Sequence, residues 1–401
     1  MNVLISGASI AGPVLAFWLR RAGYRVTVVD RAATLRTGGA GGHAVDLLGP
    51  AVEVVERMGL LDRVRAARTT TDLMRLIRPG RPTVSLNASL LLAGVSDRHV
   101  EIMRGDLAQI LYEATAGDVE YRFGTWVTAI DDGDVTFADG SRERFDLVVG
   151  ADGLHSGIRR LTFGDERQYR HFLGAYLAVF SVPDCIGLDG VTLSYNAVDR
   201  AVGVYPTHDP ARARVVFLIR AAERDYDHRD GAEQRRLLRA MADGLGWEVP
   251  NLLAHLDDAD DFYFDSISQI RLDSWSRGRV TLVGDAGYGP GPAVGGGTSL
   301  AAVGGYVLAA ELAAAGGDHT VAFGAYEAAM AGTVAGSRRI GPAVLATMVP
   351  RSERQIWTTA QALRLLPRLP KPLRARLTSF GGGPAAMLDG VRLRPFPVAA
   401  I

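Results

Sequence analysis

The sequence predicts an α/β protein with a doubly wound, Rossmann-like domain, an inserted antiparallel β-sheet unit and a helical C-terminal region. Three observations support this fold class. The chain opens with a strand, a glycine turn, a helix and a second strand. Between Phe172 and Leu272, alternating apolar and polar residues are joined by turn-rich segments, as in an antiparallel sheet with one exposed face. A mostly apolar strand then returns at Val280 to Val283, so the Rossmann-like domain is expected to be split in sequence.

The opening segment predicts a βαβ unit. Its elements are expected at Asn2 to Ser6 (strand), Gly7 to Gly12 (turn), Pro13 to Ala22 (helix) and Tyr24 to Asp30 (strand). Parallel strands need a crossover connection, and helices then cover both faces of their sheet. We therefore expect this unit to begin a buried sheet.

The remaining elements follow from periodicity. Apolar residues recur at helical spacing in Ala51 to Ala67, Asp106 to Ala116 and Leu300 to Ala315, while Phe145 to Val149 is typical of a buried strand. Within the inserted unit, strands are expected at Val191 to Tyr195, Ala201 to Tyr205, Val215 to Arg220 and Phe262 to Leu272, with a helical insert at Ala232 to Leu245. From Val321 the chain is mostly helical until Pro367, after which prolines and basic residues indicate a looser end.

These elements predict a division of the chain into alternating pieces. The Rossmann-like domain takes residues 1–70, 101–165 and 274–345, the substrate-binding sheet takes 71–100 and 166–273, and residues 346–401 form the C-terminal helical region and tail. A chain of this length agrees with two or three units.

Composition excludes several classes of protein. The 44 basic and 44 acidic side chains balance, so neither nucleic acid nor a membrane surface is an expected partner. Cys185 is the one cysteine, and the eight histidines are scattered without an H-E-x-x-H motif, so we expect no disulfide and no metal site. We see no apolar run that meets the ~18 residues of a membrane span, and no signal peptide, so a cytoplasmic location is expected.

The first motif is the glycine turn at the end of the first strand. Gly7-Ala8-Ser9-Ile10-Ala11-Gly12 matches G-x-G-x-x-G except at Ser9. Gly7 would permit the tight turn, and Gly12 would allow the helix to pack closely on the strand. The helix N-terminus favours a diphosphate, and Asp30 at the end of the second strand can accept hydrogen bonds from a ribose. The pattern indicates a dinucleotide site, whereas a glycine turn without function is the simpler alternative.

Two further motifs end strands later in the chain. In Gly150-Ala151-Asp152-Gly153, flexible backbone and a carboxylate lie at the carboxyl edge of the sheet, where doubly wound folds bind ligands. A glycine- and proline-rich loop runs from Gly284 to Gly297 and must cap a helix or surround a ligand. Asp285 in this loop would need hydrogen-bond donors, which polyol hydroxyls would supply.

With these three motifs in this order, residues 1–345 resemble the FAD-dependent aromatic-hydroxylase family of single-component flavoprotein monooxygenases, including the tetracycline-inactivating monooxygenases. The resemblance implies that Gly7 to Gly12 hold the FAD diphosphate, Asp30 the adenosine ribose, Asp152 with Gly153 the flavin and nicotinamide, and Asp285 the ribityl chain. Arg104 falls where the family has an arginine that reaches the flavin. Arg36 and Asp46 flank a glycine cluster that resembles the family's mobile flavin loop. For each arginine and for Asp46, a solvated charge is the alternative.

The cofactor-binding residues expected on this basis are Gly7, Ser9, Ala11, Gly12, Asp30, Arg31, Arg36, Asp46, Arg104, Asp152, Gly153, Asp285, Pro292, Gly295 and Gly297. Backbone N–H groups between Gly295 and Ser299 would face the negative charge of the reduced flavin. The sequence departs from the family at Ser9, Asp30, Ser299 and above all at Tyr288, where the family usually has a histidine. Any role of that histidine is therefore in doubt, but FAD binding is little affected.

The resemblance implies a monooxygenase that uses FAD, NAD(P)H and O₂ to oxygenate an aromatic, phenolic or enolic small molecule, such as a polyketide-like compound, through a flavin hydroperoxide. Tyr195, Tyr205, Phe217 and Phe264 are candidates to contact this substrate, with the strand core as the favoured alternative. Two other functions stay open: a FAD enzyme without oxygen insertion, such as a dehydrogenase, reductase or cyclase, and a non-catalytic flavin- or ligand-binding protein. The sequence leaves open the general base, the choice of NADH or NADPH, and the oligomeric state.

Overall fold

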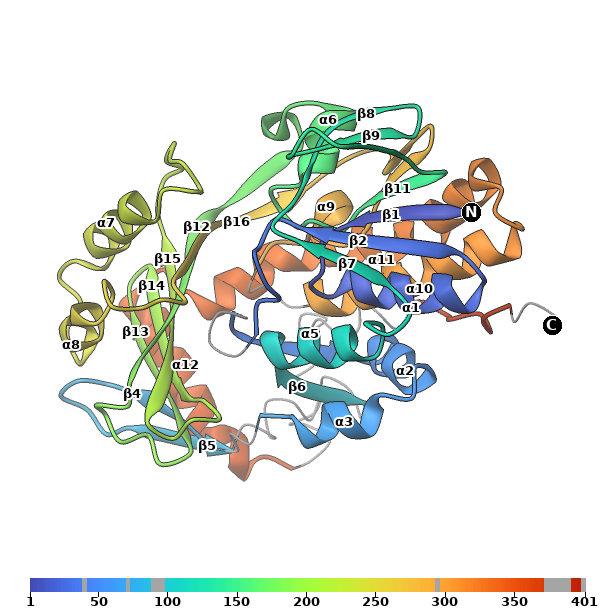
Figure 1. Ribbon diagram of the computed structural model, residues 1–401. Helices are drawn as coiled ribbons and strands as arrows, with labels where there is room; N and C mark the ends of the chain where they lie inside the picture. Colours follow the sequence, from blue (N-terminus) through green and yellow to red (C-terminus); the bar gives the residue numbers. More distant parts are fainter. Residues whose placement is uncertain (38–41, 70–72, 88–97, 293–295, 371–390, 398–401) are drawn as a thin grey trace.

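The computed structural model describes residues 1–37, 42–69, 73–87, 98–292, 296–370 and 391–397. Two lobes, each built on one large β-sheet, lie side by side (Figure 1). The architecture confirms the predicted fold class, a doubly wound domain with an inserted sheet and C-terminal helices.

The first lobe contains a six-stranded sheet. Its order is β17 (Ser276–Arg277), β18 (Val280–Leu282), β11 (Leu147–Gly150), β1 (Asn2–Ser6), β2 (Arg25–Asp30) and β7 (Glu120–Phe123). All neighbouring strands are parallel except β17 and β18. Strand β1 lies between β2 and β11, so the strand order reverses there, which is where doubly wound sheets bind ligands.

Helices cover one face of this sheet. The helices α1 (Ala11–Arg21), α10 (Gly297–Ala314) and α11 (His319–Met348) pack against one another beneath β1 and β2 (Figure 1). A three-stranded meander packs on the same hydrophobic core, with β8 (Val127–Asp131), β9 (Asp134–Phe137) and β10 (Arg142–Arg144). These short strands were not predicted, because alternation over three to five residues is too brief to recognise.

A smaller layer connects the two lobes. Strand β3 (Ala44–Leu48) pairs antiparallel with β6 (His99–Met103), which leads into α5 (Arg104–Glu113). The helical spacing predicted over residues 51–67 forms two helices, α2 (Pro50–Arg57) and α3 (Leu61–Ala66). The chain breaks between them at Gly59, whose φ of 75° is a left-handed conformation that favours glycine.

The second lobe contains a seven-stranded sheet. Its order is β16 (Tyr263–Ile270), β12 (Arg170–Pro183), β15 (Arg212–Arg220), β14 (Arg200–Pro206), β13 (Val191–Ala197), β4 (Leu73–Ile77) and β5 (Val84–Asn87). The pairs are antiparallel, as predicted, except that β13 and β4 run parallel. A parallel pair forms here because β4 comes from an earlier, separate segment of the chain and not from a hairpin with β13.

The expectation that this sheet has one exposed face is wrong. Helices α7 (Gly231–Ala242) and α8 (Val249–Ala254) cover one face and complete a hydrophobic core with it. On the other face, Leu345 and Val349 at the end of α11 pack against β12 and β15. Both faces are therefore occupied, and α12 (Glu353–Leu365) packs against β5 at the far edge.

The end of the described chain returns to the first lobe. After α12 and the short helix η3 (Leu366–Arg368), residues 391–397 lie against α1 and α10, where Phe396 packs on Trp18 with ring centroids 4.7 Å apart. The Arg57 guanidinium donates to the carbonyls of Leu393 (3.1 Å) and Arg394 (2.7 Å). The looser end that prolines and basic residues indicated is thus wrong for 391–397, because apolar side chains and carbonyl groups anchor this segment.

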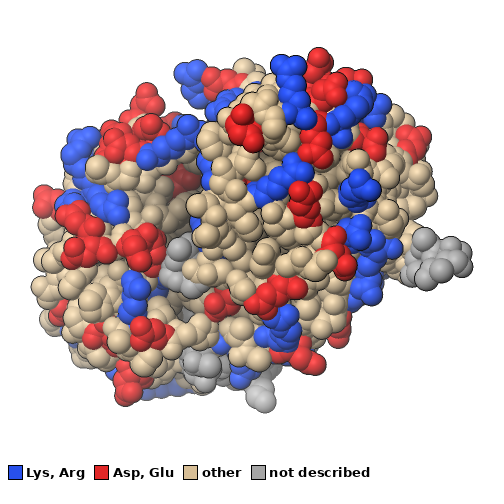
Figure 2. Space-filling model, in the orientation of Figure 1, with Lys and Arg blue, Asp and Glu red and all other residues tan. Residues whose placement is uncertain are grey.

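Helix α10 is long and apolar enough to cross a membrane, whereas the sequence was expected to hold no apolar run of that length. Among the described residues it is the one helix that meets this test, and 67% of its 18-residue window is buried inside the protein. It packs between α1 and α11 as a core helix. On the face shown in Figure 2, basic and acidic side chains intermix, in keeping with the balanced charge of the sequence.

Candidate FAD and substrate site

The first glycine turn joins β1 to α1 in a space that admits no larger side chain. Gly7 has a φ of 115°, and a Cβ atom there would lie 2.2 Å from the Ala151 carbonyl oxygen. A Cβ atom on Gly12 would lie 1.9 Å from the Gly7 carbonyl oxygen. Both glycines are therefore required by the close approach of backbone, which brings the turn against the end of β11.

A cavity of about 550 Å³ lies between the two lobes, beyond the carboxyl ends of β1 and β2. Ten of the predicted residues line it: Ser9, Ala11, Asp30, Arg36, Asp46, Arg104, Gly153, Asp285, Pro292 and Gly297. Gly7 and Gly12 shape the turn without lining the cavity, and Gly295 lies outside the described residues. The structure thus brings together residues from six segments that are far apart in the sequence.

Asp30 and Arg31 separate at the end of β2. The Asp30 carboxylate accepts hydrogen bonds from the backbone N–H groups of Ala8 and Ala32, each at 2.9 Å, and still lines the cavity. Arg31 turns to the outside, where its guanidinium stacks over the Trp126 ring at 4.3 Å. Arg31 is not among the residues that line the cavity.

The Asp152 carboxylate is engaged by its own loop. It accepts hydrogen bonds from the backbone N–H groups of Gly157 (2.8 Å) and Ile158 (3.2 Å) and from the Ser156 hydroxyl (2.5 Å). These groups belong to the start of α6 (Gly157–Phe163). Burial raises the pKa of Asp152, and the hydrogen bond from Ser156 opposes this shift. Asp152 therefore fixes the loop that brings Gly153 to the cavity, while its predicted cofactor contact stays a prediction.

Asp285 begins the short helix α9 (Asp285–Tyr288) and faces the cavity. Within the part of the chain that the structure describes, no group donates a hydrogen bond to its carboxylate. Its side chain is open to the cavity although protein atoms surround the site. Burial among these protein atoms raises the pKa of Asp285, and the positive charges of Arg104 and Arg159 oppose the rise. An acceptor with this environment fits a ligand that carries hydroxyl donors.

Arg104 and Asp46 lie on paired elements at one wall of the cavity. The Arg104 guanidinium donates to the Ser9 hydroxyl at 3.1 Å, so it reaches the first glycine turn. Asp46 lies within strand β3, and its carboxylate contacts His99 Nε2 at 2.7 Å. Strand pairing and this hydrogen bond fix the position of Asp46 after the glycine cluster, and its expected role at the cofactor stays a prediction. The glycines 38, 39 and 41 of that cluster lie outside the described residues.

Two departures from the family have a structural explanation. The Ser299 hydroxyl donates to the Asp46 carbonyl (2.8 Å) and accepts from the Leu48 N–H (3.0 Å), so it joins α10 to β3. Tyr288, the last residue of α9, is fully buried, and its hydroxyl accepts a hydrogen bond from that of Tyr326 at 2.9 Å. Tyr288 does not line the cavity. Its difference from the family histidine therefore concerns the core.

Residues of the inserted sheet form the apolar wall of the cavity. Leu177, Val216 and Leu218 line it together with Met348 from the end of α11. Of the four aromatic candidates, Tyr205 lines the cavity, and its hydroxyl accepts from the Ala44 N–H at 3.1 Å. Tyr195, Phe217 and Phe264 belong to the core beneath α7 and α8. Successive strand residues face opposite sides of a sheet, so most of these aromatics cannot reach the cavity.

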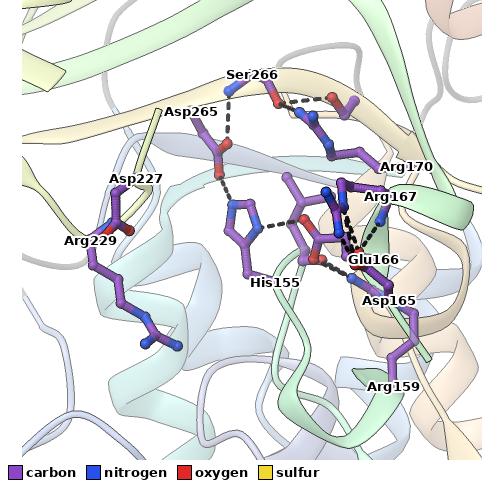
Figure 3. Close-up of polar contacts among 12 residues, drawn as sticks. His155, Arg159, Asp165, Glu166, Arg167, Arg170, Asp227, Arg229, Asp265 and Ser266 are labelled. Atoms are coloured by element: carbon purple, nitrogen blue, oxygen red, sulfur yellow. Dashed lines mark hydrogen bonds and ion pairs between the residues drawn. The ribbon is translucent and has the colours of Figure 1, made fainter. Parts of the chain in front are cut away.

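Sequence reasoning missed several residues of the site. His43 lines the cavity, and burial lowers its pKa to about 4, which keeps the imidazole neutral. Tyr263 also lines the cavity, at the start of β16. Behind it, Asp265, His155 and Glu166 form a chain of hydrogen bonds between the lobes (Figure 3). His155 directly follows the Asp-Gly-Leu stretch, which was the signal available in the sequence.

Comparisons with known proteins agree with this geometry. A model described as FAD binding domain matches residues 1–321. An uncharacterized protein of Mycobacterium tuberculosis H37Rv is 43% identical over 340 residues, which cover 83% of this chain and 90% of that protein. A flavin-dependent monooxygenase of Legionella longbeachae is 36% identical over 357 residues, 88% of this chain and 91% of the relative. The crystal structure of the tetracycline destructase Tet(51) is similar with a TM-score of 0.81 and 34% identity, covering 99% of both chains.

The fold and the site thus define a FAD-dependent oxidoreductase. The chain belongs to the FAD-dependent aromatic-hydroxylase family of flavoprotein monooxygenases.

FAD fits the residues that the structure places around the cavity. The tight turn at Gly7 and Gly12 leads into the N-terminus of α1, which favours a diphosphate. The Asp285 carboxylate, which faces this cavity, suits the hydroxyls of a ribityl chain. The start of α1 and Asp285 line one cavity that also includes Asp30 and Arg104.

Proposed function

We propose that this protein uses NAD(P)H and O₂ to insert one oxygen atom into an aromatic, phenolic or enolic small molecule. The observation that carries the proposal is the continuity of the cavity. The same space is lined by the cofactor-binding turn and by the apolar side chains Leu177, Val216 and Leu218 of the inserted sheet. A flat, largely apolar substrate on that wall would lie next to the bound flavin.

Different residues around the cavity would bind different parts of FAD. The turn from Gly7 to Gly12 would hold the diphosphate, Asp30 the ribose and Asp285 the ribityl chain, while Arg104 would approach the flavin. Bound FAD, once reduced, supplies the activation of O₂. The protein contributes orientation and a site from which water is largely excluded. The N-terminus of α10, at Gly297 and Thr298, would stabilise negative charge on the cofactor.

Two observations support a substrate of polyketide-like chemistry. The wall formed by β12 and β15 is apolar, which suits a fused-ring compound. The related destructase acts, by its name, on tetracycline, and its structure matches this chain over 99% of both lengths. Hydroxyl-rich polycyclic phenols are therefore the substrates to examine first.

The test is product analysis under labelled oxygen. Purified holoprotein would be incubated with NADH or NADPH and a panel of phenolic polyketides under ¹⁸O₂, and products would be weighed by mass spectrometry. We expect NAD(P)H consumption and a product that carries one ¹⁸O atom. Substrate oxidation without ¹⁸O incorporation would favour a dehydrogenase, reductase or cyclase. Colourless protein, or protein whose flavin no reductant and substrate combination reduces, would favour a binding protein.

A further inference from the structure

We propose that Tyr263 recognises a hydroxyl group of the substrate by accepting a hydrogen bond from it, because Asp265 takes the one proton that Tyr263 can donate. This inference rests on the proposed function and adds to it a requirement on substrate chemistry. Four polar residues, Tyr263, Asp265, His155 and Glu166, form a chain that begins at the cavity wall and ends between the two lobes.

The first member, Tyr263, belongs to the cavity and to the polar chain at once. It is the first residue of β16 and lines the cavity. Burial is the main cause that raises the pKa of its phenol. Of the charged residues that also line the cavity, Arg104 lowers this pKa and Asp285 raises it. Its hydroxyl donates to Asp265 Oδ2 at 3.2 Å. A substrate in the cavity and the buried carboxylate would both contact this hydroxyl. Because Tyr263 already donates its one hydrogen bond to Asp265, a substrate can only donate to the Tyr263 oxygen.

The second member, Asp265, is placed to accept on both oxygens. It is 3% exposed, and Oδ1 accepts from the Tyr226 hydroxyl (3.2 Å) and the Ser266 N–H (2.7 Å). Oδ2 accepts hydrogen bonds from the Tyr263 hydroxyl and from His155 Nε2, the latter at 3.0 Å. Four groups direct hydrogen bonds to these two oxygens, so the carboxylate acts as an acceptor. Both tyrosines must thus donate toward Asp265, and burial together with the Asp265 charge raises the pKa of each, so both stay protonated.

The third and fourth members hold Asp265 in this state. His155 bridges two carboxylates, with Nδ1 2.8 Å from Glu166 Oε1 and Nε2 facing Asp265 (Figure 3). Burial lowers the pKa of His155, but the hydrogen bonds to Asp265 and Glu166 outweigh it and raise the pKa to about 9. At neutral pH the ring is therefore a cation with two N–H donors. Glu166 is itself paired with the fully buried Arg159 at 2.5 Å.

Other groups complete the surroundings of His155. The His228 ring stacks on it with centroids 4.1 Å apart, and the nearby charges on Arg229 and His155 lower the pKa of His228 in addition to its burial. His228 is therefore neutral at neutral pH and does not compete for the two carboxylates. His155 holds the Asp265 carboxylate in its orientation, so the acceptor role of Tyr263 is built into the junction of the two lobes.

The consequence is a preference for one kind of substrate group. A phenolic oxygen has one proton and can also accept hydrogen bonds. Because the proton points to Asp265, the oxygen of Tyr263 offers the cavity an acceptor. A substrate hydroxyl can donate to it, whereas the corresponding methyl ether cannot and would leave the acceptor unpaired.

The experiment compares the binding of a hydroxyl compound and its methyl ether to FAD-loaded protein without NAD(P)H. The probes are 2-naphthol and 2-methoxynaphthalene, and calorimetric titration measures both dissociation constants. We expect wild-type protein to bind 2-naphthol about fivefold more tightly, as one hydrogen bond of ordinary strength predicts. Tyr263→Phe should abolish this preference by weakening 2-naphthol alone.

Two further variants separate the acceptor from a general effect on the cavity. Tyr226→Phe removes another hydroxyl from the same Asp265 carboxylate but leaves Tyr263 in place, so the preference should persist. Asp265→Asn introduces an amide that can donate to Tyr263, which would turn the tyrosine proton toward the cavity, so the preference should fall.

Three results would overturn the inference. In the first, the wild-type protein does not prefer 2-naphthol. In the second, the Tyr263→Phe protein keeps the preference. In the third, Tyr263→Phe weakens the binding of both probes by the same factor. A loss of FAD content in Tyr263→Phe with the preference intact would place Tyr263 on the cofactor instead. No turnover is involved, so a failure here is distinct from the absence of ¹⁸O-labelled product, which would refute the proposed function.

Discussion

At the scale of single residues, some side chains face the cavity and are open to a ligand, whereas others only shape the loops around it. Asp285 faces the cavity, and none of the described residues donates a hydrogen bond to its carboxylate, whereas the Asp152 carboxylate is engaged by the N-terminus of α6. Both aspartates lie one or two residues after a glycine that follows a buried strand, Gly284 for Asp285 and Gly150 for Asp152, and the sequence alone does not distinguish them. The difference arises from whether the chain that follows folds back to donate to the carboxylate.

Asp285 yields the first prediction. Asp285→Ala would remove hydrogen bonds between a carboxylate and the ribityl hydroxyls, worth roughly 1.5 to 3 kcal/mol. We expect the affinity for FAD to fall by about one to two orders of magnitude. Fluorescence titration of apoprotein with FAD measures this change, and Asp285→Asn should retain part of the affinity. An Asp285→Ala protein that retains flavin as wild type does would exclude the role.

At the scale of elements, much of the fold could be predicted because the signals are local. The strand, turn, helix and strand at the start of the chain appear where periodicity placed them, within two residues. The short strands β8, β9 and β10 could not be predicted, because alternation over three to five residues is too brief to recognise. The side of the sheet on which Tyr195 and Phe217 lie depends on strand register and on the cover of α7 and α8, which composition does not reveal.

The contact between helices α9 and α11 gives the second prediction. Tyr288→Phe removes a hydroxyl that is hydrogen bonded to Tyr326 within the core, so the free energy of unfolding should fall by about 1 kcal/mol. FAD content should be unchanged, because Tyr288 does not line the cavity. Urea denaturation and flavin absorbance measure the two effects.

Tyr326→Phe is the matched control. It also removes the hydrogen bond to the Leu282 carbonyl and should destabilise the protein more. If Tyr288→Phe instead releases FAD at unchanged stability, Tyr288 acts on the cofactor and its assignment to the core is wrong.

At the scale of the whole molecule, the two lobes meet through charged groups that titrate. His155 lies between Glu166 and Asp265, which come from different elements of the chain. Its pKa rises from an ordinary value of 6.5 to about 9 on folding, so folding favours the protonated form. The stability that this gives is complete below about pH 6.5 and is lost as the pH rises through about 9.

The third prediction follows from this sign. His155→Gln should destabilise the protein near pH 6, and the difference from wild type should shrink steadily between pH 6.5 and 9. Urea midpoints of FAD-loaded protein across this range measure the effect. A difference that stays constant with pH would mean that His155 contributes packing alone.

The fourth prediction concerns the C-terminal segment 391–397. Phe396→Ala should expose Trp18, which is 5% exposed and stacks on that ring. We expect the tryptophan emission to shift to longer wavelength, with the signal absent in a Trp18→Phe, Phe396→Ala double variant. An unchanged emission spectrum would mean that α1 and α10 bury Trp18 without help.

The anchoring of residues 391–397 also bears on how the protein is handled. A protease that cuts before residue 391 would release the segment that covers Trp18 and Tyr306, and would leave the Arg57 guanidinium without the carbonyls of Leu393 and Arg394. The uncovered patch lies on α1, whose N-terminus forms the dinucleotide turn. We therefore expect the cleaved protein to aggregate and to lose its bound flavin at the same time. The intact mass of a preparation is then as informative as its flavin absorbance.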